Sequence, residues 1–461
     1  MKTLRYILVR VLSVRRTVCV LSALCAVLLA VQAQDFTRMS ERSIMGTARY
    51  VGMGGAMTAI GGDPSASLDN PAGLGLYRRW EVLLTMTDLM FDRTQQITSD
   101  DMINPPKRRL YMVPQASVVF CLPTYNPDDQ GVQYHNLLFS YQRVHTYNRT
   151  YSAGGVGDPS LGALLATTSV NWDIPFCADA NNVADDILLR ESGYVNEYSF
   201  DYAMNIKNQW YVGIGLRMQS YLLSADATYY EEFATFNADR KRYSNTNTTA
   251  LQYSAVSCNM AVGLIYRPTK WLRMGVGFQT PTIGSLTTYT SGTLTAMTDS
   301  LRSSYAPNCQ YNDKAFHMPL HLSTSLAFQL SAYGMLSFQY DYRHAKYVQD
   351  THSLRAGLEI IPVMGMYVNA GYVYESTFNR QTTVVPMDPT FDRQDTYFFQ
   401  PRWTQYVSCA IGYRGSAMIV QAAYQYRWQR TDLYAHEDIV TPYNMHADTH
   451  RLVITLGWHS N

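Results

Sequence analysis

The chain is constrained most strongly by a two-residue alternation of apolar and polar side chains that recurs along most of its length. Between residues 210 and 219, Trp210 and Leu216 fall on one face and Arg217 falls on the other. Successive side chains of a β-strand point to opposite faces, so this pattern predicts strands with one apolar and one polar face. The alternation recurs at 318–330, 418–429 and 451–459. We therefore expect an all-β protein.

The connections between the expected strands distinguish a membrane barrel from a soluble sandwich, which also alternates. The pattern places fourteen strands near residues 79–92, 111–122, 133–146, 193–206, 209–224, 250–266, 271–283, 315–330, 334–345, 352–361, 366–378, 403–413, 417–430 and 448–459. Brief turns alternate with long polar segments at 147–192, 225–249, 284–314, 379–402 and 431–447. Short turns at one rim, long loops at the other and an even strand number are typical of bacterial outer-membrane barrels. The prediction is a transmembrane antiparallel β-barrel of about 14 strands over residues 79–461.

Composition agrees with a surface that meets both lipid and water. Charged residues make up 16% of the 461 residues, against about 25% in an average soluble protein. Tyrosine is abundant, with 36 Tyr against 16 Phe, and its amphipathic ring favours membrane interfaces. The formal net charge of +1 gives no electrostatic reason to expect a nucleic-acid partner.

Residues 1–33 predict export. A basic head with Lys2 and Arg5 precedes the apolar stretch from Val18 to Val31, and Val31-Gln32-Ala33 offers small residues for signal-peptidase cleavage. A permanent anchor helix is the alternative, but the apolar run is shorter than the ~20 residues that a span needs. No later segment has 18 consecutive apolar residues, so we expect a cleaved signal peptide and a bacterial outer-membrane location.

Residues 34–78 differ from the rest of the chain because small residues replace the alternation. Gly54-Gly55 and the triplet Asn70-Pro71-Ala72 belong to a run rich in glycine and turn formers, which lets backbone pack closely against a neighbouring surface. Such a segment suits a plug inside a barrel. A periplasmic extension that leads into the first strand is the alternative reading.

The run from Gly52 to Ala59, followed by Asn70-Pro71-Ala72 and Leu74, resembles the N-terminal part of the FadL family. These proteins are outer-membrane transporters of long-chain fatty acids and other hydrophobic compounds. The resemblance implies a fourteen-stranded barrel in which residues 34–78 form a hatch in the lumen. It further implies that Asn70, Pro71 and Ala72, together with Gly54 and Gly55, belong to the gating region.

The expected extracellular loop at 147–192 is unusually apolar. Clusters of this kind mark binding surfaces when they are exposed, or pack on one another to close the barrel mouth. The two interpretations stay open and are compatible, and the groove for an oily ligand is expected at Leu161, Leu164, Leu165, Trp172, Ile174 and Phe176.

Catalytic and metal-binding patterns are weak. His317 and His321, like His446 and His450, have HxxxH spacing, but on a strand the two rings would begin about 13 Å apart, too far for one metal ion. The sequence has no GxSxG elbow and no HExxH motif, so a catalytic role is not expected. The five cysteines after residue 33 are widely spaced and match neither a metal pattern nor a disulfide framework. We predict no enzyme activity, no metal and no cofactor.

Taken together, these patterns predict passive transport of hydrophobic compounds, such as a long-chain fatty acid, across the outer membrane. A movable hatch would gate the barrel, and the expected partners are the hydrophobic small molecule and outer-membrane lipid, with a monomeric barrel. Two alternatives remain open. One is a scaffold or shuttle that serves protein secretion or surface attachment, and the other is haem uptake.

Overall fold

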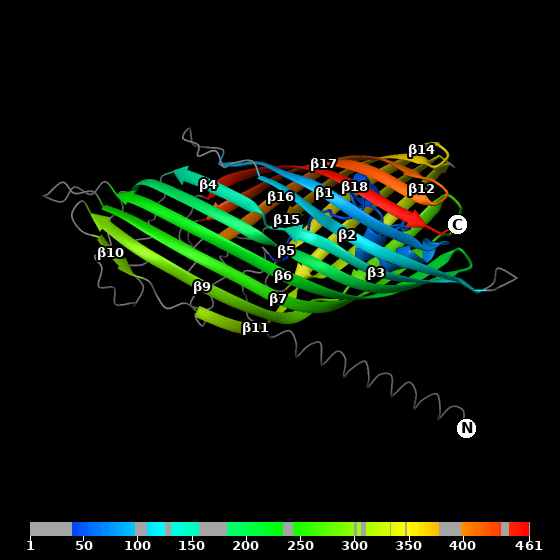
Figure 1. Ribbon diagram of the computed structural model, residues 1–461, viewed down its shortest axis with the longest axis horizontal. Helices are drawn as coiled ribbons and strands as arrows, with labels where there is room; N and C mark the ends of the chain where they lie inside the picture. Colours follow the sequence, from blue (N-terminus) through cyan, green and yellow to red (C-terminus); the bar gives the residue numbers. More distant parts are fainter. Residues whose placement is uncertain are drawn as a thin grey trace, which may run out of the picture.

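The computed structural model shows a closed antiparallel β-barrel of fourteen strands (Figure 1). The described residues are 39–96, 108–124, 131–155, 182–233, 243–298, 302–305, 310–331, 333–345, 348–377, 398–434 and 442–460. The predicted fold class and strand number are therefore confirmed. The predicted signal peptide, residues 1–33, lies outside the described residues.

Eighteen strand segments and three short helical turns are assigned within the described part of the chain. The helical turns are α2 (Ala48–Gly52), η1 (Pro64–Leu68) and η2 (Pro71–Leu76). The strands are β1 (Glu81–Gln96), β2 (Arg108–Pro123), β3 (Val132–Thr146), β4 (Arg149–Gly155), β5 (Asn182–Ile206), β6 (Trp210–Phe233), β7 (Tyr243–Tyr266), β8 (Leu272–Gln279), β9 (Thr282–Thr298), β10 (Arg302–Tyr305), β11 (Gln310–Met318), β12 (Leu320–Ser331), β13 (Gly334–Ala345), β14 (Val348–Val363), β15 (Met366–Thr377), β16 (Phe398–Arg414), β17 (Met418–Tyr434) and β18 (Tyr443–His459).

Interruptions explain why eighteen segments form fourteen barrel strands. Pro281 separates β8 from β9, and Pro319 separates β11 from β12, because proline cannot donate a backbone hydrogen bond to the ladder. A third interruption at residues 147–148 separates β3 from β4, and β10 pairs only with the outer end of β9. The ladder closes where β1 pairs with β18 along its length.

Several strands are longer than the sequence pattern indicated. The segments expected as polar loops at 147–192, 225–249 and 284–314 are partly strand, since β5, β6, β7 and β9 continue far beyond the predicted ends. These extensions are rich in threonine and tyrosine, which favour strands without being apolar. The hydrophobic alternation fades where the sheet leaves the membrane, although the strands themselves continue. The prediction that these whole segments are loops was therefore wrong.

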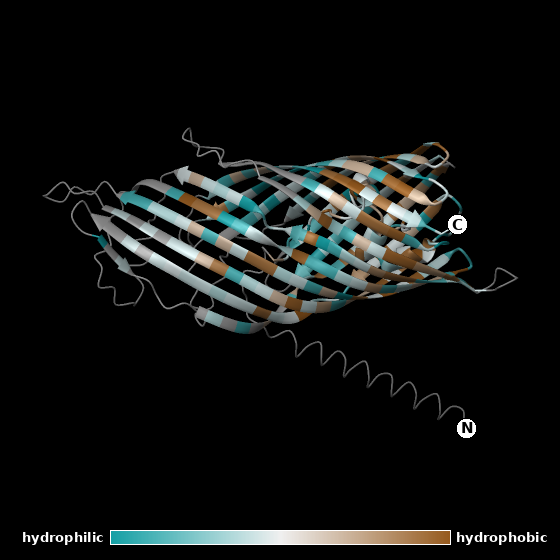
Figure 2. Cartoon of the chain, viewed as in Figure 1, coloured by the Kyte–Doolittle hydropathy of each residue, from teal (hydrophilic) through white to brown (hydrophobic). Residues whose placement is uncertain are grey.

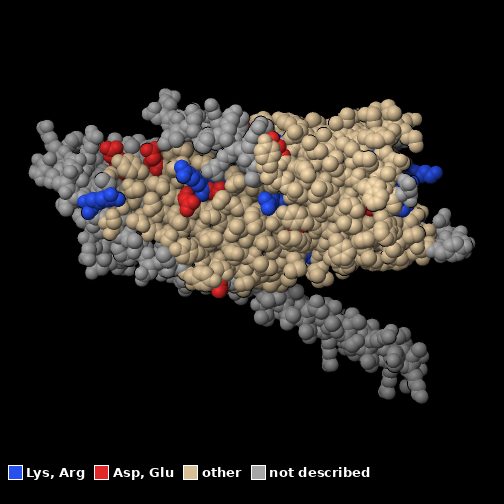
Figure 3. Space-filling view, viewed as in Figure 1, with Lys and Arg blue, Asp and Glu red and all other residues tan. Residues whose placement is uncertain are grey.

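The outer face of the barrel carries an apolar band. Trp210, Ile214, Leu216 and Leu326 are exposed on it, and Phe328 stacks on Trp271 beside them. Figure 2 shows the strongly hydrophobic positions concentrated in the half of the barrel that includes the C-terminus. On the viewed face, charged side chains gather toward the tips of β4 to β9 and at the opposite rim, with an uncharged stretch between them (Figure 3). The uncharged stretch is the lipid-facing surface.

The wall has a break in its hydrogen-bonded ladder between β2 and β3. Pairing of these strands stops at Gln115 and Gln142, whereas β2 continues to Arg108 along β1. Pro114 lies at this point and removes a backbone donor from β2. Beyond it the chain of β3 continues into β4, which pairs with β5 and also contacts β1 and β18.

Candidate functional site

The lumen is occupied at the periplasmic half by residues 39–77, named here the lumenal segment. Its helical turns contact opposite arcs of the wall: η2 packs on β5, β6 and β7, and α2 packs on β16 and β17. Figure 1 shows these turns enclosed by the strands near the C-terminal end of the barrel. None of the helices within the described residues is long and apolar enough to cross a membrane.

Wall glycines allow this close approach. A Cβ added at Gly213 would lie 2.4 Å from the carbonyl carbon of Pro71, and a Cβ at Gly371 would lie 2.2 Å from the amide nitrogen of Gly54. No side chain fits at such distances, so backbone meets backbone at both points. The glycines of β6 and β15 are thus a steric requirement of the docked segment.

The triplet Asn70-Pro71-Ala72 lies at the start of η2. Asn70 caps the turn, since its side-chain oxygen accepts a hydrogen bond from Ala72 N at 3.0 Å, and Pro71 occupies the first helical position. The amide group of Asn70 also donates to Thr58 O at 2.8 Å and to Leu264 O of β7 at 3.3 Å. One side chain therefore joins two parts of the lumenal segment to the wall.

Gly54 and Gly55 form the exit from α2. Their φ angles are +61° and +70°, which lie in the left-handed region that glycine adopts without a steric penalty. This turn places the carbonyl of Gly55 where Arg355 Nη1 donates to it at 3.3 Å. The predicted gating residues are thus all in the docked segment, at two separate contacts with the wall.

Inward-facing arginines from the wall hold the segment along its length. Arg217, which is fully buried, binds Glu197 at 3.1 Å and Asp201 at 3.5 Å, and also donates to the carbonyl of Ser67. Other wall arginines donate to carbonyls of the segment: Arg273 to Ile60, Arg343 to Ser40, Arg355 to Gly55 and Arg451 to Ile44. Buried carbonyls and charges thereby satisfy one another.

Arg49 belongs to the segment and donates to a carboxylate of the wall. Its Nε and Nη2 bind the two carboxylate oxygens of Glu359 in β14 at 2.7 and 2.9 Å. Although burial opposes the charged form, the Glu359 carboxylate keeps the pKa of Arg49 above its usual value. A bidentate pair of this kind fixes both distance and orientation.

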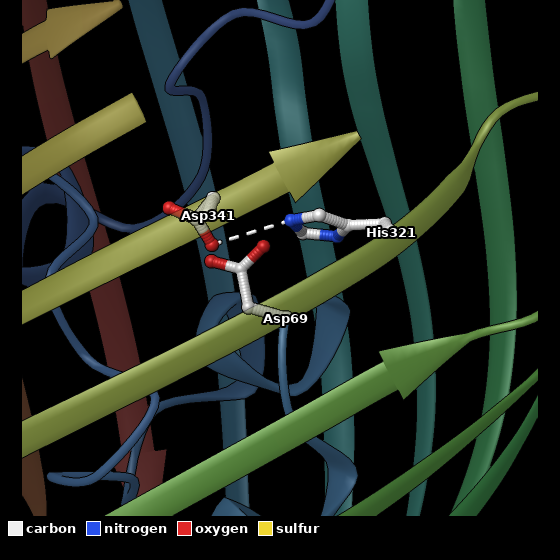
Figure 4. Close-up of side chains that lie close together, drawn as sticks. All are labelled: Asp69, His321 and Asp341. Carbon is white, nitrogen blue, oxygen red and sulfur yellow. Dashed lines mark hydrogen bonds and ion pairs between the residues drawn. The ribbon is translucent and has the colours of Figure 1, made fainter. Parts of the chain in front are cut away.

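Asp69, His321 and Asp341 lie close together where the segment meets β12 and β13 (Figure 4). His321 Nε2 is 3.2 Å from Asp341 Oδ1. The guanidinium group of Arg355 lies between the two carboxylates, because it contacts Asp341 at 2.8 Å and Asp69 at 3.1 Å. A metal ion would have to share this space with the guanidinium. The arrangement therefore acts as an ion-pair link between segment and wall.

Burial also fixes the protonation of groups in the segment. It raises the pKa of the Tyr50 phenol well above its ordinary value, and the Asp69 carboxylate raises it further. Tyr50 therefore stays protonated and donates to Asp69 at 2.8 Å. Burial likewise raises the pKa of Asp63, although the hydroxyl of Thr47 and the charge of Arg49 oppose the shift.

The lumen above the segment contains two apolar clusters, with buried polar groups such as Arg149 and Glu191 beside them. A middle cluster surrounds the buried side chain of Met39, and its other members are Val144, Tyr147, Val195, Tyr221, Leu223, Ala255, Leu286 and Met318. Nearer the strand tips lies a mouth cluster, made of Tyr151, Ala153, Ile187, Leu189, Ala225, Ala227, Tyr229, Leu251, Leu433, Tyr434, Tyr443 and Met445. The mouth cluster joins β4–β7 to β17 and β18.

Two small hollows remain between the segment and the middle cluster. Their volumes are about 30 and 20 Å³, enough for one or two water molecules each. Arg42, His321 and Arg343 line both hollows, and Met39 and Met318 line the second. Neither hollow has room for more than water in this conformation.

The residues predicted to form a ligand groove have no described position. Leu161, Leu164, Leu165, Trp172, Ile174 and Phe176 all lie between residues 156 and 181, outside the described residues. Two apolar residues of the same expected loop, Ile187 and Leu189, are described, and both are buried in the mouth cluster. The four histidines weighed as HxxxH pairs lie on strands: His317 is partly exposed, His321 is buried in the lumen, and His446 and His450 lie on the outer face of β18.

Sequence reasoning did not single out the wall arginines or the middle cluster. A signal was present, since Arg217, Arg343 and Arg451 all occupy the polar, lumen-facing positions of alternating strands. A charged residue there needs a partner inside a filled lumen. The middle cluster could not be found in this way, because it collects single residues from strands that are distant in sequence.

Comparison with known proteins finds solved structures that are similar to this barrel. Neither a protein-family model nor a curated protein matches the chain. Among solved structures, a Pseudomonas aeruginosa FadL homologue is similar with a TM-score of 0.55 and 12% identity, covering 91% of this chain and 99% of that chain. The Ralstonia pickettii toluene transporter TbuX is similar with a TM-score of 0.53 and 14% identity, and the CymD monoaromatic hydrocarbon channel with a TM-score of 0.50 and 12% identity. Both comparisons cover 91% of this chain and 99% of the other chain.

These similarities extend over most of the chain at an identity too low to carry residue roles across. They agree with the closed antiparallel barrel of fourteen strands described above. The chain therefore has the fold of the FadL-type outer-membrane barrels.

Proposed function

We propose that this protein carries hydrophobic small molecules passively across the outer membrane, with the lumenal segment as a hatch. The observation that supports this most directly is the order of surfaces along the lumen. Apolar clusters occupy the outer part, and a segment held by buried polar contacts as well as apolar packing closes the inner part. A water-filled pore offers an oily molecule no favourable site, whereas apolar side chains that separate can exchange their mutual contacts for contacts with the ligand.

The conformation described is the closed member of a two-state equilibrium. A ligand shifts such an equilibrium only if it binds the open state more tightly than the closed state. The small hollows leave no room for a lipid chain, so a bound ligand requires displacement of Met39 or of the mouth cluster. The break in the β2–β3 ladder offers a second way out of the lumen, sideways toward lipid.

An amphipathic acid is the substrate class that we favour over a neutral hydrocarbon. Arg42 and Arg343 line the hollow beside the apolar middle cluster, and they contact the carboxylates of Glu197 and Glu375, which a ligand carboxylate would replace. A carboxylate head would meet guanidinium groups there while its alkyl chain lay among Met39, Val144 and Met318. Toluene has no group that could use those arginines.

The test compares uptake in cells that carry the wild-type barrel or the double variant Asn70→Ala/Pro71→Ala. Labelled long-chain fatty acid and labelled toluene are the two substrates, and the exposed Arg79→Ala is the matched control. We expect the double variant to assemble in the membrane while fatty-acid uptake falls several-fold, with the control unchanged. Faster uptake of toluene than of fatty acid by the wild type would overturn the substrate class but not the transport function.

The rival functions give different results in the same cells. If wild-type and empty-vector cells take up both substrates equally and cells without the protein lose secreted or surface-attached proteins, a scaffold replaces the transporter. If the purified barrel instead binds haem, seen by its absorption spectrum, and supports growth on haem, haem uptake replaces it.

A further inference from the structure

Two hairpins on the outside of the barrel repeat the same residues. In β13 and β14 the residues are Tyr340-Asp341-Tyr342-Arg343 and Asp350-Thr351-His352-Ser353-Leu354. In β17 and β18 they are Tyr424-Gln425-Tyr426-Arg427 and Asp448-Thr449-His450-Arg451-Leu452. Only one position in each strand differs between the two hairpins. Both differing positions face the lumen, so the outward-facing residues of the repeat are identical.

The strand registers of the two hairpins are also the same. Tyr342 pairs with His352 as Tyr426 pairs with His450, and Tyr340 pairs with Leu354 as Tyr424 pairs with Leu452. We name the outward-facing residues of each repeat a Tyr–His cluster.

The side-chain geometry is repeated in detail. Tyr340 Oη lies 2.6 Å from His352 Nδ1, and Tyr424 Oη lies 2.6 Å from His450 Nδ1. The second tyrosine of each cluster packs on the same imidazole, with ring centroids 5.1 Å apart for Tyr342 and 4.8 Å apart for Tyr426. Two copies of one preformed arrangement thus lie on the same side of the barrel, separated by β15 and β16.

Each cluster continues the lipid-facing surface. Leu354 and Leu452 lie directly on the membrane side of the histidines and are 58% and 46% exposed. A molecule whose apolar part contacts these leucines places its head group on the tyrosines, the imidazole and the aspartate. These residues lie toward the outer rim, because β13 and β17 run outward from the short turns at the opposite rim. The occupant that fits is therefore a lipid of the outer leaflet.

The charges of the clusters indicate a sugar head group rather than a phosphate. The arginines of the repeat, Arg343 and Arg427, face the lumen, so the repeated set turns hydroxyls, imidazoles and carboxylates outward. Asp350 contacts His344 at 2.6 Å and Asp448 contacts His446 at 3.1 Å, and a carboxylate at each place disfavours a phosphate but accepts a hydrogen bond from a sugar hydroxyl. The exposed tyrosine rings offer flat apolar faces with a polar edge, which suits the two-sided surface of a sugar ring.

From these observations we propose that the two Tyr–His clusters are twin binding sites for the sugar head group of an outer-leaflet glycolipid. Each cluster takes one lipid, held by the tyrosine faces, the imidazole and the aspartate above the exposed leucine. The sites lie on the outer wall and do not depend on the transport function or on the hatch.

The experiment counts bound lipid by native mass spectrometry on delipidated barrel in a detergent without sugar. The probes are rough lipopolysaccharide, the same lipid after removal of its phosphates, and phosphatidylglycerol. We expect two glycolipids per wild-type barrel, with or without phosphates, at a concentration where phosphatidylglycerol gives none. His352→Ala and His450→Ala should each leave one, and the double variant should leave none.

The barrel supplies its own control. His135 Nδ1 lies 2.6 Å from Tyr202 Oη near the opposite rim, so His135→Ala removes the same kind of pair elsewhere and should leave two lipids bound. Tyr340→Phe and Tyr424→Phe remove only a hydroxyl, and they test the sites if an alanine variant fails to fold. Retention of two glycolipids by the double variant, equal binding of phosphatidylglycerol, or loss of binding with the phosphates would overturn the proposal.

Discussion

The base and the mouth of the lumen are closed in different ways. At the base, the lumenal segment is held by directional contacts, such as Arg217 with Ser67 and the bidentate pair of Arg49 with Glu359. At the mouth, β4–β7 meet β17 and β18 through apolar side chains such as Leu189 and Leu433. The base adds directed charge contacts to its apolar packing, whereas the mouth cluster depends mainly on excluding water.

This difference determines what can open each closure. Apolar contacts are non-directional, so an oily ligand replaces them at little cost. Buried ion pairs lose several kcal/mol when one partner leaves without a substitute. The mouth therefore suits capture of a hydrophobic molecule, and the base suits a gate that stays shut until its polar contacts are exchanged together.

The largest expected effect is at the base. Replacement of Arg217 by Met leaves Glu197 and Asp201 buried without their partner and should destabilise the fold by about 3–5 kcal/mol. Unfolding in urea, followed by tryptophan fluorescence, measures this loss. The exposed Arg190 of the neighbouring strand β5 is the matched control, and Arg190→Met should change stability by less than about 0.5 kcal/mol. Similar values for the two variants would contradict a charge-held base.

A smaller effect is expected at the mouth. Leu189→Ala removes a fully buried side chain from the mouth cluster and should cost roughly 2–3 kcal/mol, because a cluster near the strand tips can partly collapse into the space. The variant should take up hydrophobic substrate at least as fast as the wild type. Leu188→Ala on the opposite face of β5 is the control for strand propensity. A clear loss of uptake in Leu189→Ala alone would mean that ligand capture by the mouth cluster, and not its opening, limits uptake.

Loss of the Asn70 cap tests one contact of the base by itself. Asn70→Ala should weaken docking of the lumenal segment by about 1–2 kcal/mol, since it removes the bond to Ala72 N and leaves two carbonyls without their donor. Hydrogen exchange should rise in residues 64–77 and remain unchanged in β17 and β18. Gln252→Ala, on the outer face of β7, should change neither region. Uniform exchange across the barrel would show that the segment and wall unfold as one unit.

The smallest effect concerns Thr47, whose hydroxyl donates to Asp63 at 2.7 Å and accepts from Tyr50 N at 3.2 Å. Thr47→Ser keeps both bonds and should change stability by less than about 0.5 kcal/mol, whereas Thr47→Ala should cost about 1 kcal/mol. Thermal unfolding of both variants beside the wild type measures the difference. Equal midpoints would mean that the cap adds nothing to the polar contacts of the base.

Some of this architecture follows directly from local sequence. Alternation along β6 places Trp210 and Leu216 toward lipid and Arg217 toward the lumen, and the structure has them so. Turn formers locate the bends of the lumenal segment, where Asn70 and Pro71 begin η2 and Gly54 and Gly55 follow α2. Both signals are local, because strand geometry repeats every two residues and a turn involves only a few consecutive residues.

Other features could not be anticipated along the chain. The strands β5, β6, β7 and β9 extend beyond the membrane, where the hydrophobic alternation of their inner halves is lost, so these strands were predicted too short. The middle cluster around Met39 and the link from Arg355 to Asp69 and Asp341 unite residues hundreds of positions apart. Such contacts depend on which lumen-facing residues of different strands lie at the same level along the barrel axis.

The sequence by itself therefore determined the barrel, its approximate strand number and the two faces of each strand, because these follow from residue periodicity and loop length. Only the tertiary structure decided that the base combines apolar packing with buried charge contacts while the mouth closes on apolar side chains, because closing the barrel is what brings distant strands to a common lumen. The same closure sets the height of each lumen-facing side chain, and with it the partner that each buried charge can reach.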